Sequence, residues 1–350
     1  MSTVACRGER LLEVCDLAVH FTLKRSLGDR LARRGGQVAR AVDGVSLALG
    51  RGELLALVGE SGSGKTTMAL AALRLIDPTA GRVLLEGRDV TALSRRELRP
   101  LRRRAQLIHQ DPYAVLDPRL RTYDLIAEAL RIHGLKQSSR AEEREAVHDA
   151  LEKVGLTPVE SFAGRYPHQL SGGQRQRVAI AGSLVLGPSL LVADEPVSML
   201  DVSVRAGVLD LLDRLRDEED VGILMITHDL ATAAHVSDRV AVMYHGNLVE
   251  LGPARTVIDA PQHPYTQALI HAVPRVHRQE ERVRTLPGDP PDASHVPTGC
   301  RFHPRCPLCE ERCRVEVPEL LPAADGGDVV VACHLRVAAL KAGDENGLTG

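Results

Sequence analysis

The stretch that decides the fold runs from residue 54 to residue 66 and reads Leu54-Leu55-Ala56-Leu57-Val58-Gly59-Glu60-Ser61-Gly62-Ser63-Gly64-Lys65-Thr66. Its first five residues are all apolar, which predicts a short buried strand of a parallel sheet. A glycine-rich turn follows, and the apolar residues from Thr66 to Ile76 fit the period of a helix. A strand that passes through glycines into a helix is typical of an anion site, because backbone N–H groups at a helix start face outward.

This turn matches the phosphate-loop pattern G-x-x-x-x-G-K-[ST] at every position, with the strand before it and the helix after it that the pattern requires. The glycines allow consecutive N–H groups to face phosphate oxygens. We expect the Lys65 ammonium to reach the terminal phosphates of a nucleotide and the Thr66 hydroxyl to ligate Mg²⁺. The predicted phosphate-binding residues are Gly59, Glu60, Ser61, Gly62, Ser63, Gly64, Lys65, Thr66 and Thr67.

A second apolar run, Leu190 to Ala193, ends on two acidic residues, Asp194 and Glu195. We expect Asp194 to emerge from a buried strand beside the nucleotide and to bind Mg²⁺ directly or through water. Glu195 then stands where it can hold the water that attacks the terminal phosphate. Two solvated carboxylates at a strand end are common, but the phosphate loop upstream favours the functional interpretation.

The order of segments predicts an α/β fold. Residues 223–226 are another apolar run that closes on a polar residue, whereas residues 95–165 are rich in Arg and Glu and read as mostly helical. Strands that alternate with helices indicate a parallel sheet with its ligand at the carboxyl ends of the strands. Beyond Pro274 the chain becomes rich in Pro, Cys and His, which indicates a small separate module.

Composition excludes several classes of function. The formal net charge of −2 argues against a nucleic-acid binder, which needs an excess of Lys and Arg. No run approaches the roughly 18–20 apolar residues that cross a bilayer, and the N-terminus carries charges where a signal peptide is apolar. We therefore expect a soluble, cytoplasmic protein. The asparagines, Asn247 and Asn346, do not form the Asn-Lys-x-Asp guanine reader of a Ras-like GTPase.

Residues 170–174, Leu-Ser-Gly-Gly-Gln, resemble the signature motif of ATP-binding cassette (ABC) proteins. Ser171 can cap a helix, and Gly172 and Gly173 expose backbone N–H groups at its start, so the motif is suited to an anion. In the family this motif, which includes Gln174, contacts the terminal phosphate bound by the phosphate loop of the opposite subunit. The resemblance therefore implies a pair of cassettes that enclose ATP between them.

The remaining parts of the family pattern follow in order. Gln110 resembles the Q-loop glutamine, which implies contacts with Mg²⁺ and with a transmembrane partner. Asp201 resembles the D-loop aspartate that communicates across the dimer, and His228 resembles the switch histidine that contacts the terminal phosphate. Phe21 stands near the position of the aromatic residue that stacks on adenine, although a role in the core is equally consistent with the sequence.

A closer resemblance narrows the family to the ATPases of oligopeptide and dipeptide importers. It rests on four passages, namely Ala41-Val42-Asp43-Gly44-Val45-Ser46, Gln110-Asp111-Pro112-Tyr113, Tyr166-Pro167-His168-Gln169, and His263-Pro264-Tyr265-Thr266 followed by the cysteine-bearing tail. Relatives in this group also import nickel or short oligosaccharides, so the cargo stays open. His109 stands where Phe is usual and Asp117 where Asn is usual, both in the region expected to face the membrane partner.

The resemblance implies a P-loop NTPase fold of the ABC type with a parallel-sheet core, an antiparallel N-terminal sheet, a helical subdomain and a small cysteine-containing C-terminal module. We expect the nucleotide-binding domain at 1–272, the helical subdomain at about 111–188 and the C-terminal module at 273–350. The implied partners are two transmembrane permease subunits, a second ABC ATPase that is usually a paralogue, and indirectly an extracytoplasmic substrate-binding protein. No nucleic acid is implied, and the expected location is the cytoplasmic face of the cell membrane.

Three other kinds of protein carry similar motifs. ABC ATPases of DNA repair insert long coiled coils, whereas here 104 residues without extended heptads separate Lys65 from Leu170. Translation-type ABC ATPases carry two cassettes, and this chain has one set of motifs. A small-molecule kinase with a phosphate loop has no use for the signature motif. An importer ATPase that uses ATP and Mg²⁺ is the interpretation that accounts for all the motifs.

The tail holds four cysteines that resemble a set which, in several relatives, binds a [4Fe–4S] cluster: Cys300, Cys306, Cys313 and Cys333. Four thiolates suit such a cluster. Their spacings, C-x5-C-x6-C and then C-x19-C, are looser than the pairs of ordinary zinc sites. Zinc remains an alternative, since Cys309 forms a close pair with Cys306 and both His303 and His334 are near in sequence. A third alternative is packing without a metal. A cluster would be structural, pinning a tail too short to build its own core.

Overall fold

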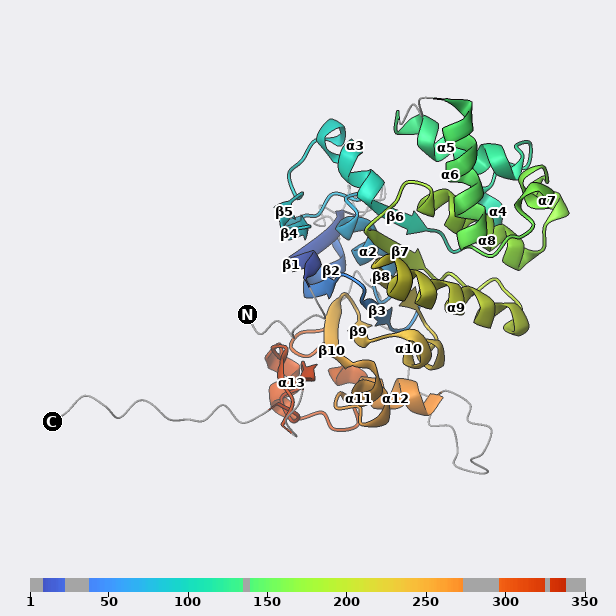
Figure 1. The fold of residues 1–350 in the computed structure, drawn as a ribbon. Coiled ribbons are helices and arrows are strands. Elements are labelled where there is room, and N and C mark those ends of the chain that lie inside the picture. The colour runs from blue at the N-terminus through green and yellow to red at the C-terminus, as the bar shows by residue number, and fades with distance from the viewer. Residues whose placement is uncertain (1–8, 23–37, 135–138, 273–295, 325–327, 338–350) are drawn as a thin grey trace, which may run out of the picture.

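The computed structural model describes residues 9–22, 38–134, 139–272, 296–324 and 328–337 (Figure 1). Within these residues an antiparallel sheet is built from four strands in the order β2-β1-β4-β5. Its members are β1 (Arg10–Thr22), β2 (Val38–Gly50), β4 (Ala80–Leu85) and β5 (Arg88–Asp89). Leu12, Val14 and Leu17 of β1 are buried in one apolar core with Met68. The predicted antiparallel N-terminal sheet is confirmed.

The larger sheet carries the core, with strand order β11-β12-β10-β9-β3-β8-β7-β6. The strands β9, β3, β8, β7 and β6 run parallel to one another, and β10, β12 and β11 add to one edge in antiparallel fashion. In chain order the members are β3 (Leu54–Val58), β6 (Ala105–Ile108), β7 (Leu190–Asp194), β8 (Gly222–Thr227), β9 (Arg239–Tyr244), β10 (Asn247–Pro253), β11 (Leu321–Pro322) and β12 (Val330–Val331). β3 and β8 are buried along their whole length, as continuous apolar runs require between two layers.

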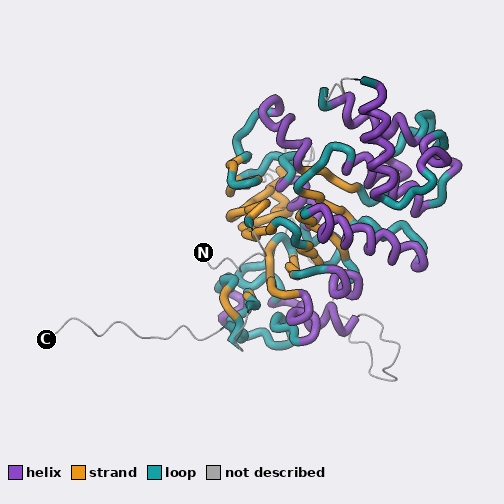
Figure 2. Tube along the Cα trace, in the orientation of Figure 1, coloured by secondary structure: helices purple, strands orange, loops and turns teal. Residues whose placement is uncertain are grey.

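Helices pack against both faces of this sheet, and a group of them stands to one side (Figures 1 and 2). The side group, green in Figure 1, consists of α4 (Pro112–Val115), α5 (Thr122–Ile132), α6 (Arg140–Lys153), α7 (Val159–Ala163), the short η1 (Pro167–Gln169) and α8 (Gly172–Leu184). Within the described residues up to 272, the other helices are α2 (Lys65–Ala72), α3 (Arg95–Arg104), α9 (Val202–Glu219), α10 (Leu230–Val236), α11 (Ala254–Asp259) and α12 (Pro264–Ala272). Among the described residues, no helix is long and apolar enough to cross a membrane.

The three strands predicted from apolar runs are confirmed as β3, β7 and β8. Two details differ from the sequence-based prediction. The helix after the phosphate loop ends at Ala72 rather than Ile76, and Arg74 just beyond it adopts the left-handed φ of 54°. The polar region from 95 to 165 also contains one strand, β6 (Ala105–Ile108), which pairs with β7 in parallel.

The described part of the C-terminal region is joined to the main sheet. Val330 and Val331 of β12 pair with Leu251 and Glu250 of β10, and η2 (His303–Arg305) and α13 (Glu311–Val315) lie beside them (Figure 1). Phe302 is buried in the main core. A segment this short buries too little surface to stand alone, so it completes an existing edge. The boundary at 272/273 stays a prediction, since residues 273–295 lie outside the described ranges.

Candidate nucleotide site

The phosphate loop needs its glycines for close packing and for backbone conformation. A Cβ on Gly59 would lie 2.2 Å from the Met243 carbonyl oxygen, and one on Gly64 would lie 2.1 Å from the Ala41 carbonyl oxygen. Gly64 also has a φ of 101°, a left-handed value that turns the chain directly into α2. The loop is therefore fixed between β9 and β2, with the amino end of α2 facing the place for the phosphates.

Lys65 is buried within this loop, 6% exposed. Its ammonium donates hydrogen bonds to the carbonyl oxygens of Gly59 and Glu60, both at 2.8 Å, and to Ser63 Oγ at 3.3 Å. Burial lowers the Lys65 pKa, and the nearby carboxylates of Glu195, Asp194 and Glu60 act in the opposite direction. The ammonium thus rests on acceptors of the loop itself, which phosphate oxygens can replace.

Asp194 ends β7 next to the phosphate loop. Its Oδ1 accepts a hydrogen bond from Thr66 Oγ1 at 3.1 Å, so two of the three residues predicted to contact Mg²⁺ lie together, while the third, Gln110, is bonded to Glu195. Burial raises the Asp194 pKa, and the bond from Thr66 partly offsets it. Mg²⁺ in such sites takes one or two protein oxygens and completes its shell with phosphates and water, so this hydroxyl–carboxylate pair fits the ion.

Glu195 is held between two other predicted residues. Its Oε2 accepts from Gln110 Nε2 and its Oε1 is bonded to His228 Nδ1, both at 3.0 Å. Glu195 has a φ of 46°, a left-handed conformation that costs about 1–3 kcal/mol in a residue other than glycine. Strained backbone of this kind is typical of functional sites. The structure thus brings together the three residues assigned to the Q-loop, the catalytic carboxylate and the switch.

The signature motif begins α8. Ser171 Oγ accepts from the Gln174 N–H at 3.3 Å and Gln174 Oε1 accepts from the Ser171 N–H at 3.0 Å, which is a capping box. A Cβ on Gly173 would lie 2.2 Å from Val204 Cγ1, so this glycine allows α8 to approach α9. Among the described residues, no hydrogen bond or ion pair links residues 171–174 to residues 59–67.

Asp201 and Phe21 belong to other elements, at the start of α9 and near the end of β1. Asp201 precedes α9, and its carbonyl accepts from the N–H groups of Val204 and Arg205. Ser198, three residues earlier, donates its hydroxyl to the Glu195 carbonyl oxygen at 3.1 Å, which ties this loop to the acidic residue. Phe21 is 41% exposed near the end of β1. Its alternative role as a core residue is therefore wrong, and its stacking on adenine stays a prediction.

The four cysteines of the tail gather in one region without forming a metal site. Burial, together with neighbouring Cys313, Cys306 and Cys333, raises the pKa of Cys300 to about 11. Among the described residues, no group of three or more His, Cys, Asp or Glu side chains is arranged to hold a metal ion. The [4Fe–4S] cluster and its zinc alternative therefore stay predictions. Burial and the neighbouring thiols both disfavour the Cys300 thiolate, so the uncharged thiol is the stable form of Cys300 in the metal-free protein.

Two contacts of the phosphate loop were missed by sequence reasoning. The Tyr265 hydroxyl accepts from the Glu60 N–H at 2.9 Å, and Arg305 forms an ion pair with the Glu60 carboxylate. Tyr265 lies in the His-Pro-Tyr-Thr passage, which served only as a mark of resemblance. No signal in the sequence connects it to residue 60, because the two are 205 positions apart.

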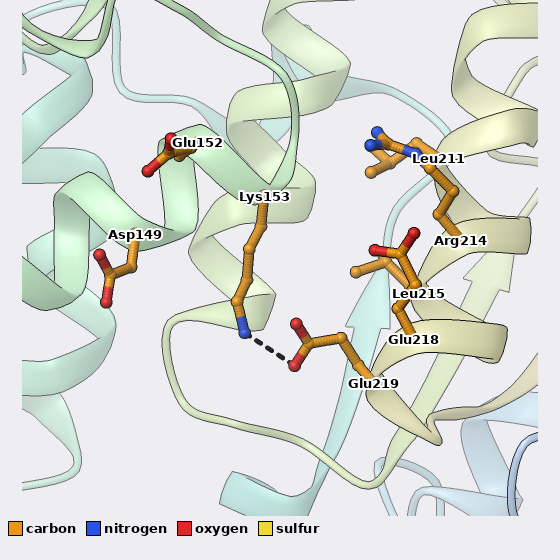
Figure 3. Close-up of a pocket in the computed structure, with 8 residues that line it drawn as sticks. All are labelled: Asp149, Glu152, Lys153, Leu211, Arg214, Leu215, Glu218 and Glu219. Carbon is orange, nitrogen blue, oxygen red and sulfur yellow. Dashed lines mark hydrogen bonds and ion pairs between the residues drawn. The ribbon is translucent and has the colours of Figure 1, made fainter.

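A hollow of 310 Å³ lies elsewhere, between α6 and α9 (Figure 3). Asp149, Glu152 and Lys153 line it from α6, and residues of α9 such as Glu219 line the other side. The Lys153 ammonium and the Glu219 carboxylate are 2.7 Å apart across it. None of the predicted site residues lines this hollow. Its charged, opposed walls are those of a solvated gap between two helices.

The fold and the site together define a P-loop NTPase, in which a phosphate loop, a hydroxyl–carboxylate pair for Mg²⁺ and a held glutamate meet at the carboxyl end of a parallel sheet. Two family models match the chain. The model described as ABC transporter covers residues 42–198, and the model described as oligopeptide/dipeptide transporter, C-terminal region, covers residues 249–313.

Similar proteins agree with this assignment. The peptide ABC transporter ATP-binding protein y4tS of Sinorhizobium fredii is 46% identical over 95% of this chain and 92% of its own. The oligopeptide transport ATP-binding protein AppF of Bacillus subtilis is 44% identical over 95% of this chain and 99% of its own. A solved dimeric ATP-binding cassette bound to ADP and Pi matches with a TM-score of 0.61 and 27% identity, covering 70% of this chain and 99% of that one.

The chain belongs to the ATP-binding proteins of ABC transporters, in the group that carries the oligopeptide/dipeptide transporter C-terminal region. It is an ABC ATPase, and ATP with Mg²⁺ is the substrate that the site accommodates.

Proposed function

We propose that this protein is the ATP-hydrolysing subunit of a peptide importer at the cytoplasmic face of the cell membrane. The observation that carries the proposal is the Glu195 carboxylate held between Gln110 and His228, in a chain whose residues 249–313 match the peptide-transporter C-terminal region. The held carboxylate accounts for hydrolysis. The match of the C-terminal region favours di- and oligopeptides over nickel or short oligosaccharides as cargo.

Binding of ATP begins with an exchange of partners at Lys65. Phosphate oxygens replace the Gly59 and Glu60 carbonyl oxygens that accept from its ammonium in the structure, and the N–H groups at the start of α2 add donors. Thr66 and Asp194 are the residues that would hold Mg²⁺. The ion's part is to neutralise charge on the phosphate oxygens.

Hydrolysis then requires one proton transfer. Glu195 holds a water molecule in line with the terminal phosphorus and accepts its proton as the oxygen–phosphorus bond forms and the bond to the ADP oxygen breaks. The products are ADP and phosphate. Gln110 and His228 orient the carboxylate, and the His228 side chain, 60% exposed, is free to turn toward the terminal phosphate.

We further propose that the complete site needs a second cassette. Ser171 and the N–H groups of Gly172 and Gly173 form a capped helix start that is not bonded to the chain's own phosphate loop, and they would face the terminal phosphate held by the partner. The solved dimeric cassette among the similar structures supports a paired arrangement. A paralogous ABC ATPase is the proposed partner.

The proposed contact with two permease subunits lies next to Gln110. Tyr113 and Val115 of α4 are 59% and 47% exposed, and exposed apolar side chains of this size are typical of protein–protein contacts. His109 and Asp117, the two departures from the family pattern, flank the same helix. An extracytoplasmic substrate-binding protein would deliver peptide to the permeases.

We also propose that Cys300, Cys306, Cys313 and Cys333 take up a [4Fe–4S] cluster, with zinc as the alternative. Support comes from the closeness of the four thiols in the fold, with Cys300 neighbouring Cys313, Cys306 and Cys333, since a bound cation favours the thiolate form of its ligands. Anaerobically purified protein should be brown and contain about four irons per chain. Colourless protein with stoichiometric zinc, or with neither metal, contradicts the cluster.

Uptake of labelled peptides tests the importer. Cells that express Glu195→Gln in place of the natural chain should lose uptake of labelled di- and oligopeptides, while uptake of nickel and of short oligosaccharides persists. Intact peptide uptake together with loss of nickel or sugar uptake would assign the motor to another cargo.

A further inference from the structure

Glu60, the second residue of the phosphate loop, has all its polar groups bound. Its N–H donates to the Tyr265 hydroxyl at 2.9 Å, and its carbonyl accepts from Lys65 at 2.8 Å. Its carboxylate accepts two bonds from Arg305, at 2.8 and 3.1 Å. Two of these partners, Tyr265 and Arg305, come from beyond residue 260, so the C-terminal part of the chain is hydrogen-bonded to the phosphate loop.

The side chains of Tyr265 and Arg305 are fixed by burial and by aromatic packing. Tyr265 is fully buried, and Arg305 is 7% exposed. The Tyr265 ring packs against Tyr244 and Phe302, with centroids 4.6 and 5.4 Å apart. The Arg305 guanidinium lies over the Tyr244 ring, 5.9 Å from its centroid. Buried aromatic packing of this kind fixes both donors and acceptors in one geometry.

The His-Pro-Tyr-Thr passage explains how Tyr265 reaches the loop. His263 is buried, and burial lowers its pKa to about 3. The His263 side chain is therefore a neutral imidazole, and its Nδ1 accepts a hydrogen bond from the Tyr265 backbone N–H at 3.0 Å. The backbone N–H of His263 donates to the Glu250 carboxylate at 2.9 Å. These bonds start α12 in the orientation that directs the Tyr265 hydroxyl at Glu60.

Charge gives Arg305 a further role. A carboxylate beside the phosphate tail repels ATP, and in a partly buried site one unit charge a few ångströms away is worth several kcal/mol at most. The bidentate Arg305 guanidinium cancels the Glu60 charge. When ATP draws Lys65 away from the Glu60 carbonyl, Tyr265 and Arg305 still hold this residue in place.

We propose that the C-terminal region acts as a clamp on the phosphate loop, in which Arg305 and Tyr265 are positioning residues for ATP binding and Arg305 also neutralises Glu60. The proposal deepens the proposed function and rests on it only in that the loop binds ATP. It links the transporter-type C-terminal region, which has no part in the catalytic steps above, to the phosphate loop.

A double-mutant cycle on the full-length chain tests the clamp. The dissociation constant of a fluorescent ATP analogue with Mg²⁺ is measured for Arg305→Met, Glu60→Gln and the double variant, since Met keeps much of the buried volume of Arg. Arg305→Met should weaken binding at least about tenfold. Adding Glu60→Gln to that variant should restore at least about fivefold, because the uncompensated charge is gone.

Arg301→Met is the matched control. Arg301 comes from the same region, is buried to a similar degree and is ion-paired with Asp43 rather than with the phosphate loop. It should keep the ATP affinity and show no coupling to Glu60→Gln. Thermal melting of each variant establishes that it is folded.

Tyr265→Phe separates the hydrogen bond from the charge. It removes only the hydroxyl that accepts the Glu60 N–H and should weaken ATP binding by about three- to tenfold. The clamp is overturned if folded Arg305→Met binds ATP as the natural chain does, or if Glu60→Gln restores nothing to it. Failure of peptide uptake with this coupling intact would instead count against the importer and leave the clamp standing.

Discussion

At the scale of single residues, the Glu195 carboxylate is the group that we propose as the acceptor of the water proton in hydrolysis. Glu195→Gln keeps the shape and the bond from Gln110 but removes the acceptor for the water proton. We expect ATP to bind while turnover falls at least about 100-fold. Steady-state phosphate release and nucleotide binding on the purified complex measure the two effects. Full turnover would remove Glu195 from this role.

The ionisation of Cys300 gives a second test at this scale. In the metal-free protein its pKa of about 11, raised chiefly by burial, keeps the thiol protonated at pH 8. Unfolding returns the pKa to its ordinary value, so the thiolate fraction at pH 8 rises about 100-fold. Alkylation followed by peptide mass analysis should show slow modification of Cys300 in the folded chain and fast modification in urea. Equal rates would contradict its burial among thiols.

Because the folded pKa of Cys300 is raised, its contribution to folding is most favourable at low pH. The contribution of Cys300 to the free energy of unfolding decreases as the pH rises from the ordinary pKa of a cysteine thiol to the folded-state pKa of about 11.

At the scale of secondary-structure elements, the contact between α8 and α9 depends on one glycine. A Cβ on Gly173 would lie 2.2 Å from Val204 Cγ1, whereas one on Gly182 in the same helix would meet nothing within 4 Å. Gly173→Ala should therefore destabilise the chain by about 1–3 kcal/mol, and Gly182→Ala should stabilise it by up to about 1 kcal/mol. Denaturant unfolding compares them. Equal effects would mean that α8 does not pack this closely.

The predicted clash between residue 173 and Val204 can be tested with a double variant. Val204→Ala removes the methyl groups that a new Cβ would meet, so the double variant Gly173→Ala with Val204→Ala should lose less stability than the sum of the two single changes.

Sequence reasoning reached the elements with strong local patterns. β3, β7 and β8 are continuous apolar runs, and such runs need burial on both faces. β6 was missed because its four residues, Ala105–Ile108, are too few to show a period and follow directly on the arginine-rich helix α3. β12 pairs with β10 across 79 and 81 positions, Leu251 with Val330 and Glu250 with Val331, and two-residue strands have no period of their own.

The residues of the candidate site also fall into those that local motifs predict and those that only the fold brings together. Lys65, Thr66, Asp194 and Glu195 were placed from motifs whose spacing the chemistry requires, and the structure joins Thr66 to Asp194. The grip of Arg305 on Glu60 spans 245 positions. It depends on how β10 and the C-terminal edge bring their side chains to the loop, which no local pattern encodes.

At the scale of the whole molecule, the central claim is that ATP is bound between two cassettes and hydrolysed with Glu195. In the part of the chain that the structure describes, no hydrogen bond joins the phosphate loop to the signature helix start, and we propose that the helix start of the partner supplies the donors for the far side of the terminal phosphate. Isolated chains should then hydrolyse ATP slowly, and pairing should complete the site.

Specific ATPase activity measured against protein concentration, with and without the paralogous partner, tests this claim most directly. Activity per chain should rise with concentration or on addition of the partner, and Glu195→Gln should abolish the increase. A monomeric chain whose specific activity is the same at every concentration would contradict the account.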